Sequence, residues 1–138
     1  PATTALTKLV DNQIEFASIL WDNGSNWTAG SSWEFTAPED GLYEFSAALT
    51  VTSATIGAGT YVYAFFKHTD TAASPTTTEL ARSWSTTQGI ATAMFVQNHT
   101  IYQMLAGETI SYWAYPSVGT PVTSTDQDKS WMTVRRIS

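Results

Sequence analysis

The residues with reactive side chains are few and scattered along the chain. Two histidines, His68 and His99, fall in separate strand-length segments, and the 138 residues include no cysteine. No nucleophile elbow and no helical pair of metal ligands occurs. His68 follows an apolar run at the end of a predicted strand, where we expect it to be exposed in a loop. The pattern predicts a protein that is not an enzyme, and a cleavage activity lost on substitution of Glu34 or Asp22 would contradict this.

Carboxylates offer a candidate metal site. Asp126 and Asp128 alternate in a short acidic stretch, and Asp70 lies in another predicted loop. Calcium prefers such oxygen ligands, but a dedicated calcium loop also carries a glycine and a bidentate glutamate, which this stretch lacks. We therefore expect no cofactor and favour a solvated acidic loop, with calcium as the alternative.

One polar strand carries candidates for binding. In the segment 81–86, Arg82 and Trp84 are two residues apart, so both side chains point to the same face of a strand. Tryptophan and arginine dominate binding hot spots, and an indole ring can stack on the face of a sugar. We expect these two residues to contact a glycan or a peptide.

The elements that must position these residues are predicted to be strands. Thr, Val and aromatic residues are frequent, only 13% of residues are charged, and few windows favour a helix. Short turn motifs such as Asp22-Asn23-Gly24 and Ala106-Gly107-Glu108 separate strand-length runs. We predict strands near residues 12–19, 31–36, 42–52, 60–68, 78–86, 90–104, 108–116, 118–124 and 129–137. Strands at this spacing predict an all-β sandwich.

Two strands need cover on both faces. In 42–52, apolar side chains fall mostly on odd positions, which predicts one buried and one solvated face. By contrast, 61–66 and 110–115 carry large apolar or aromatic groups on both parities. A two-sheet domain has one interior, so the second face must meet another chain, a ligand or another domain, unless Tyr and Trp tolerate exposure there. We assign five aromatic residues to an oligomer contact or to the core beneath it: Tyr61, Tyr63, Phe65, Tyr112 and Trp131.

Charge and hydropathy restrict the partners. The formal net charge is -6 with only six Lys and Arg residues, so we expect no nucleic acid partner. No apolar run approaches the roughly 20 residues that span a bilayer, and Pro1 to Ala5 lack a signal-peptide pattern. The length fits a single domain over 1–138, and the missing initiator Met suggests a C-terminal fragment of a longer protein.

The N-terminal half resembles the signature of the complement C1q globular head. Phe16, Asp22 and Trp27 are separated by five and four residues, and Phe35 precedes Gly41-Leu42-Tyr43-Glu44-Phe45 by five residues. The chain departs from the family in one extra residue between Trp27 and Phe35 and in Ala47, where the family usually has an aromatic residue. Further along, 102–110 is similar to the family's late Leu-Gly-acidic turn, and 130–134 resembles its closing strand.

The resemblance implies a fold and an assembly. Related C1q and tumour necrosis factor (TNF) heads are ten-strand jelly rolls that form trimers through aromatic side chains of middle strands, and some bind calcium near the trimer apex. The sequence of residues 27–38 and the basic C-terminal segment 134–138 are similar to those of heads found on bacteriophage fibres and capsid spikes.

A viral setting would also account for the absence of cysteine, since phage proteins assemble in a reducing cytoplasm. The resemblance thus implies a trimeric, non-enzymatic head on the virion surface, in a fibre, spike or capsid-surface protein, that adheres to a host-surface glycan or protein. Two alternatives stay open. One is a structural domain that only trimerises a stalk or decorates a capsid. The other is a secreted C1q-like ligand for a protein receptor.

Overall fold

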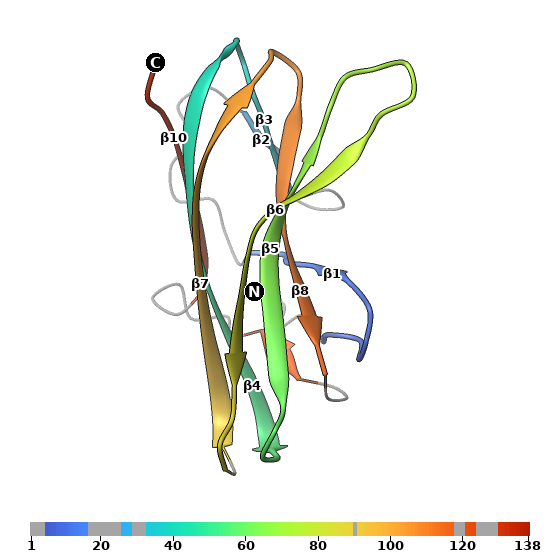
Figure 1. Ribbon diagram of the computed structural model, residues 1–138, viewed down its shortest axis with the longest axis vertical. Coiled ribbons are helices and arrows are strands. Elements are labelled where there is room, and N and C mark those ends of the chain that lie inside the picture. Colours follow the sequence, from blue (N-terminus) through green and yellow to red (C-terminus); the bar gives the residue numbers. More distant parts are fainter. Residues whose placement is uncertain (1–4, 17–25, 29–32, 90, 118–120, 124–129) are drawn as a thin grey trace.

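The computed structural model describes residues 5–16, 26–28, 33–89, 91–117, 121–123 and 130–138. Within these residues the regular structure consists of ten strands and no helix, so none could form a membrane-spanning helix. The strands are β1 (Asn12–Gln13), β2 (Trp27–Thr28), β3 (Glu34–Thr36), β4 (Gly41–Ile56), β5 (Tyr61–Thr69), β6 (Thr77–Thr86), β7 (Ala91–Met104), β8 (Thr109–Pro116), β9 (Val122–Thr123) and β10 (Trp131–Arg136). They form two antiparallel sheets that pack face to face (Figure 1), which confirms the predicted all-β sandwich.

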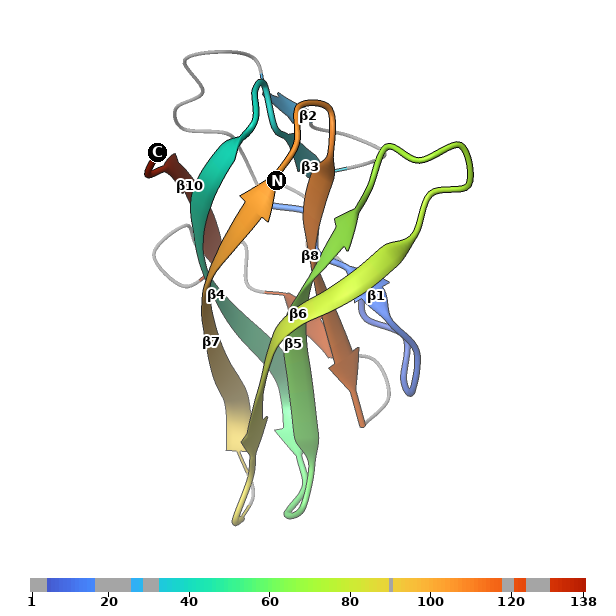
Figure 2. The same ribbon diagram turned by 45° about the horizontal axis from the view of Figure 1, so that its top comes forward.

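The two sheets differ in size. The six-stranded sheet has the order β2-β3-β8-β5-β6, and β1 also pairs with β8. The four-stranded sheet has the order β10-β4-β7, and β9 also pairs with β4. The C-terminal part of the edge strand β6 runs beside the edge strand β7 in the lower half of the views (Figures 1 and 2), and the two strands are linked where the side-chain amide of Asn98 donates to the carbonyl of Ala81. Each sheet therefore has one face in the core and one outer face.

The core follows the period-two pattern of β4. Its inward side chains are all buried: Tyr43, Phe45, Ala47, Leu49 and Val51. Ala47 occupies the aromatic position of the resembled family and fits the core as a small residue. The outward Ala48 and Thr50 are buried as well, at 0% and 8% exposure. The expectation that the second face of this strand is solvated is therefore met only in its first half.

A buried polar network ties the two sheets together. The hydroxyl of Tyr112 in β8 donates to Oδ1 of Asn98 in β7 over 2.6 Å. The amide of Asn98 donates in turn to the carbonyl of Ala64 in β5 over 2.8 Å. Burial raises the pKa of Tyr112, so its hydroxyl stays protonated and remains a donor. Because every polar group named here has a partner, the network fixes β7 against β5 and β8.

Two glycines of the resembled motifs have local structural reasons. Gly107 adopts a φ of 87°, a left-handed conformation that favours glycine, and its N–H donates to the carbonyl of Ala37 over 2.8 Å. A Cβ on Gly41 would lie 2.6 Å from the carbonyl oxygen of Ser138 and from Nε of Arg136. Gly41 is thus required for close approach of the C-terminal segment to β4.

The predicted strand positions agree with the observed ones, with differences at the ends. Each of the nine predicted segments overlaps an observed strand. The prediction missed β2, which has only two residues. It also made β1 too long, since β1 ends at Gln13, and residues 17–19 of that prediction lie outside the described residues. Short strands carry too few alternating positions to produce a periodic signal.

Candidate functional site

The two histidines lie in different environments within two different strands. His68 is inside β5, points into the sandwich and is 5% exposed. The prediction that His68 is an exposed loop residue is therefore wrong, because β5 continues to Thr69 and its inward parity includes position 68. His99 lies on the outer face of β7, with Nε2 3.0 Å from Oε1 of Glu44.

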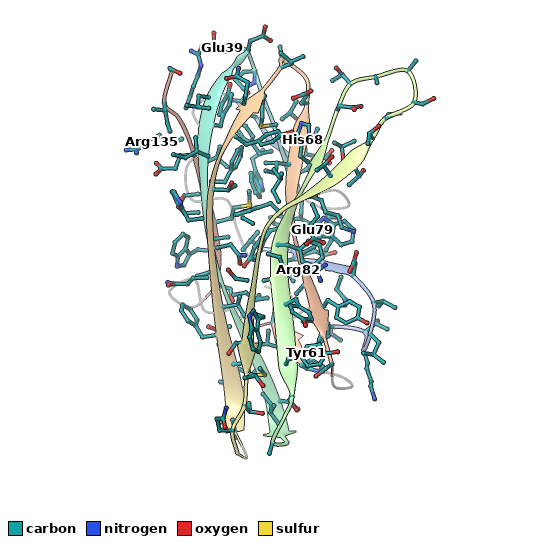
Figure 3. All side chains as sticks on the ribbon, viewed as in Figure 1. Glu39, Tyr61, His68, Glu79, Arg82 and Arg135 are labelled. Carbon is teal, nitrogen blue, oxygen red and sulfur yellow. The ribbon has the colours of Figure 1, made fainter. Side chains whose placement is uncertain are left out.

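His68 is held by a buried carboxylate. Its Nε2 lies 3.0 Å from Oε2 of Glu108, and the same oxygen accepts the backbone N–H of Leu105 over 2.8 Å. The ring of Tyr102 covers the imidazole at a centroid distance of 4.8 Å. Figure 3 shows His68 between the two sheets, near the end of the sandwich. The pair fastens the 105–108 turn to β5, which is a structural role.

The described residues bring together no cluster of three or more His, Cys, Asp or Glu side chains. Among the candidates for calcium, Asp126 and Asp128 lie outside the described residues. Asp70 accepts the backbone N–H groups of Thr76 and Ala72 over 3.0 and 3.1 Å. These hydrogen bonds, the one from Thr76 first, lower the pKa of Asp70. The Asp70 carboxylate thus organises its own turn.

The outer face of the six-stranded sheet carries most of the predicted aromatic residues, and we call it the aromatic face. It is formed by side chains of β5, β6 and β8: Tyr61, Tyr63, Phe65, Lys67, Arg82, Trp84, Trp113 and Tyr115. The strand register sets Tyr63 opposite both Trp84 and Tyr115. Ring centroids lie 5.0 Å apart for Tyr61 and Tyr63 and 6.3 Å apart for Tyr63 and Tyr115. Ring contacts therefore join the three tyrosines across β5 and β8, and the register places Trp84 of β6 beside Tyr63 on the same face.

Two cations cover part of this layer. The guanidinium carbon of Arg82 lies 5.0 Å from the ring centroids of both Tyr63 and Phe65. Nζ of Lys67 lies 4.0 Å from the ring of Trp113 and 5.7 Å from that of Phe65. Phe65 is 0% exposed although it points outward. Its cover comes from cations of the same chain rather than from a neighbouring chain.

Both cations are paired with carboxylates. Arg82 donates to both carboxylate oxygens of Glu79, from Nε over 2.6 Å and from Nη2 over 2.5 Å, and these bonds raise the pKa of Arg82. Lys67 donates to Asp11 over 2.7 Å. Figure 3 shows Glu79, Arg82 and Tyr61 in succession along β5 and β6. The aromatic face is therefore rich in charged groups but balanced in charge.

Trp84 is the uncovered member of the aromatic face, at 64% exposure. By contrast, Trp113 donates its indole N–H to Ser111 over 2.8 Å and has Lys67 over its ring. No hydrogen bond or ring contact within the described part of the chain involves the Trp84 side chain. Arg82 and Trp84 both neighbour Tyr63, although Ala81 before them has a φ of 51° and interrupts the strand register.

The outer face of the four-stranded sheet is different in character, and we call it the flat face. Its middle strand β4 presents the small residues Ser46, Ala48 and Thr50, opposite His99, Gln97 and Phe95 of β7. Phe95 and Ile101 point outward from β7 and are each 49% exposed. On the other side of β4, Trp131 is half-buried opposite Ala48. Apolar side chains thus stand on both sides of a strip of small residues.

A charged group lies at one end of the flat face. Glu44 accepts from Arg135 over 2.5 Å and lies 3.0 Å from Nε2 of His99. The hydrogen bond with His99, followed by that with Arg135, lowers the pKa of Glu44. Arg135 points away from the sandwich in Figure 3. This group marks a solvated end of the flat face.

The structure separates the five residues assigned to a contact or to the core. Tyr112 is 0% exposed within the inter-sheet core, so it belongs to the core. Tyr61 and Tyr63 are half-buried on the aromatic face, whereas Trp131 is half-buried on the flat face. These two sets lie on opposite sides of the sandwich. Copies of a chain that contact one another through opposite faces stack into an open array. A closed threefold ring needs two contact patches whose planes meet at an acute angle.

Sequence reasoning missed Phe95 and Ile101. The signal was available, because 91–104 places Met94 and Val96 on even positions and these two residues on odd ones. Both parities of β7 carry apolar side chains, as in the strands that were singled out. The pair of His68 and Glu108 had no such signal, since the two residues are 40 positions apart.

No protein-family model matches the chain, and no curated protein matches it in sequence. Solved structures do resemble it. Murine APRIL at pH 5.0 superposes with a TM-score of 0.73 at 8% identity, covering 99% of this chain and 92% of that one. The globular domain of zebrafish complement 1qA gives 0.63 at 13% identity, covering 100% and 92%. Eiger TNF from S. frugiperda gives 0.62 at 11% identity, covering 80% and 68%. Identities this low establish the fold alone, and the fold is the predicted C1q/TNF-like jelly roll.

Proposed function

We propose that this chain is the trimeric, non-enzymatic head of a bacteriophage fibre, spike or capsid-surface protein, and that it adheres to a host-surface glycan or protein. The observation that carries the assembly is the flat face, where Phe95 and Ile101 are half-exposed beside small residues of β4. The viral setting is supported by the similarity of 27–38 and 134–138 to phage heads. Three copies on one stalk would give each weak contact the benefit of avidity.

The flat face suits a subunit contact better than the aromatic face does. Burial of the aromatic face would remove two ion pairs from water, which costs several kcal/mol per ion unless geometry compensates. The middle of the flat face has small polar and apolar groups instead. Phe95 exposes about half of its surface, about 100 Å², and covering it contributes about 2.5 kcal/mol. We therefore assign Trp131, Phe95 and Ile101 to the trimer contact.

The assembly is tested by sedimentation of the wild-type chain and of two variants at micromolar concentration. Phe95→Arg places a charge in the contact and is expected to give monomers. Leu105→Arg is the matched control, because Leu105 is 52% exposed in the turn after β7, beyond the paired residues of β4 and β7, and it is expected to remain trimeric. A stable wild-type monomer, or a Phe95→Arg trimer, would refute the assignment.

The adhesive role is tested with the fluorescently labelled trimer on a panel of bacterial cells. Adhesion to some strains, with loss in the Phe95→Arg monomer, supports a multivalent head. A trimer that adheres to no cell and binds no surface extract would refute adhesion and favour the structural alternative, in which the head only holds three stalk strands together.

A further inference from the structure

We infer that the aromatic face binds a neutral oligosaccharide, with Trp84 as the stacking platform; the inference rests on the proposed adhesive function for its setting. The first support is exposure. Trp84 is 64% exposed, and the rings of Tyr63, Tyr61 and Tyr115 continue the layer beside it. A layer across three strands extends about 10 Å, which suits an oligosaccharide better than a single sugar.

The second support is the arrangement of polar groups. Within the described part of the chain, no hydrogen bond engages the hydroxyls of Tyr61, Tyr63 or Tyr115, or the indole N–H of Trp84. These groups are donors and acceptors at the rims of apolar rings. A sugar ring has the matching chemistry, because its C–H face is apolar and its hydroxyls project from the edge. Each ring of the layer can therefore pack and hydrogen-bond at once.

The third support is charge, and it separates neutral from anionic ligands. Glu79 already pairs with the Nε and Nη2 edge of Arg82, and Asp11 pairs with Lys67, so the charges of both cations are neutralised within the chain. A carboxylate or sulfate on the ligand would therefore meet an arginine whose charge Glu79 already neutralises, and it would lie close to that carboxylate. The whole chain carries a formal charge of -6, which also repels an anion. The electrostatics thus favour a ligand without charge.

The same charges argue against a protein partner. The buried centre of a protein interface is depleted of charged residues, whereas the pairs Arg82–Glu79 and Lys67–Asp11 lie within this face. A protein large enough to cover the layer would desolvate both pairs. An oligosaccharide lying along Trp84 and Tyr63 leaves them in contact with water, so it avoids that cost.

The test begins with the intact wild-type chain on an array of neutral and anionic glycans. The neutral probes are gluco-, manno-, galacto- and N-acetylglucosamine oligomers, and the anionic probes are sialylated, sulfated and uronate-containing glycans. The best neutral oligomer is then titrated by calorimetry. We expect neutral hits whose affinity changes little when salt is raised from about 0.1 M to about 1 M, because no ion pair forms on binding.

Three variants identify the site. Trp84→Ala is expected to raise the Kd for the neutral oligomer at least about tenfold, as truncation of a hot-spot tryptophan does. Leu105→Ala removes a comparably exposed apolar side chain elsewhere and is expected to leave the Kd unchanged. Glu79→Gln removes the carboxylate that neutralises Arg82. It is expected to leave the affinity for the neutral oligomer within about twofold, whereas an anionic ligand would bind more tightly.

The outcomes separate this inference from the proposed function. Adhesion of the trimer to cells without binding of any neutral glycan would overturn the inference and leave the function standing. Hits restricted to anionic glycans, or neutral binding that survives Trp84→Ala, would also overturn it. Neutral binding that depends on Trp84 in a chain that sediments as a monomer and adheres to no cell would uphold the inference and refute the proposed function.

Discussion

Replacement of Glu108 by alanine should be among the most destabilising single changes at a polar position of this protein. The side chain is buried, and one of its oxygens serves two groups, the imidazole of His68 and the N–H of Leu105. Alanine leaves both without a partner. An unsatisfied buried group costs about 1–3 kcal/mol. Leu105 lies partly at the surface, where water can replace the carboxylate, so we expect the total loss to be about 2–4 kcal/mol.

Glutamine at the same position should cost much less. Its amide oxygen can still accept from Leu105, and its NH2 group can donate to an unprotonated Nε2 of His68. We expect Glu108→Gln to lose about 1 kcal/mol or less, which is the net value of an ordinary hydrogen bond. The difference between the two variants measures the hydrogen bonds rather than the space that the side chain fills.

Urea denaturation at one fixed protein concentration is the appropriate assay, because the apparent stability of an oligomer depends on concentration. Glu39→Ala is the matched control, since it removes an exposed carboxylate that pairs with Arg136 over 2.5 Å. Exposed pairs contribute about 0–1 kcal/mol. The interpretation of His68 and Glu108 as a structural pair fails if Glu108→Ala costs no more than Glu39→Ala.

Three further changes test other parts of the fold. Gly41→Ala should lower the melting temperature, because the added Cβ would lie 2.6 Å from the C-terminal segment. Gly57→Ala is the control and should leave the melting temperature nearly unchanged, because no atom lies within 4 Å of its added Cβ. Equal effects of the two changes would contradict the packing argument. Asn98→Ala should cost about 2–4 kcal/mol in urea, more than Tyr112→Phe, because it removes the hydrogen-bond partner of groups on three strands, β5, β6 and β8. The lowered pKa of Asp70 means that its stabilising effect is complete above about pH 4 and is lost as the pH falls through the folded-state value. Asp70→Asn should therefore flatten the dependence of unfolding free energy on pH below about pH 4, and an unchanged slope would contradict it.

The sequence predicts this sandwich well because its long strands carry strong periodic signals. In β4, five alternate positions are buried, as the pattern requires. The turn at Gly107 and the close approach at Gly41 coincide with the motif glycines. Where the prediction failed, the sequence did not show which residue lies next to which in the folded chain. Neither His68 nor Glu108 reveals its partner from its own flanking residues, so burial of the pair could not be inferred.

The strands with apolar side chains on both faces show a less obvious failure of the sequence prediction. Their composition correctly indicates that both faces of β5 need cover, but it does not say what supplies the cover. Phe65 is covered by Arg82 from the next strand and by Lys67 two residues along its own strand. Long cationic side chains can lie with their aliphatic stems over apolar surface. A chain can therefore cover an aromatic face with its own side chains. Cations near such a strand should therefore weaken any inference of a subunit contact.

This distinction has a functional consequence, because the cover from the same chain and the cover that we propose from a neighbouring copy lie on opposite sides of the sandwich. The aromatic face is partly covered by its own cations, with Trp84 left open, and the flat face leaves Phe95 and Ile101 half-exposed, where we propose that another copy covers them. Assembly and recognition would then be separable by mutation. A Phe95→Arg monomer should keep the single-site affinity of the trimer for a glycan and lose only the gain from multivalency. If that monomer lost single-site binding as well, the ligand site would lie at the subunit contact and the division between the two faces would be wrong.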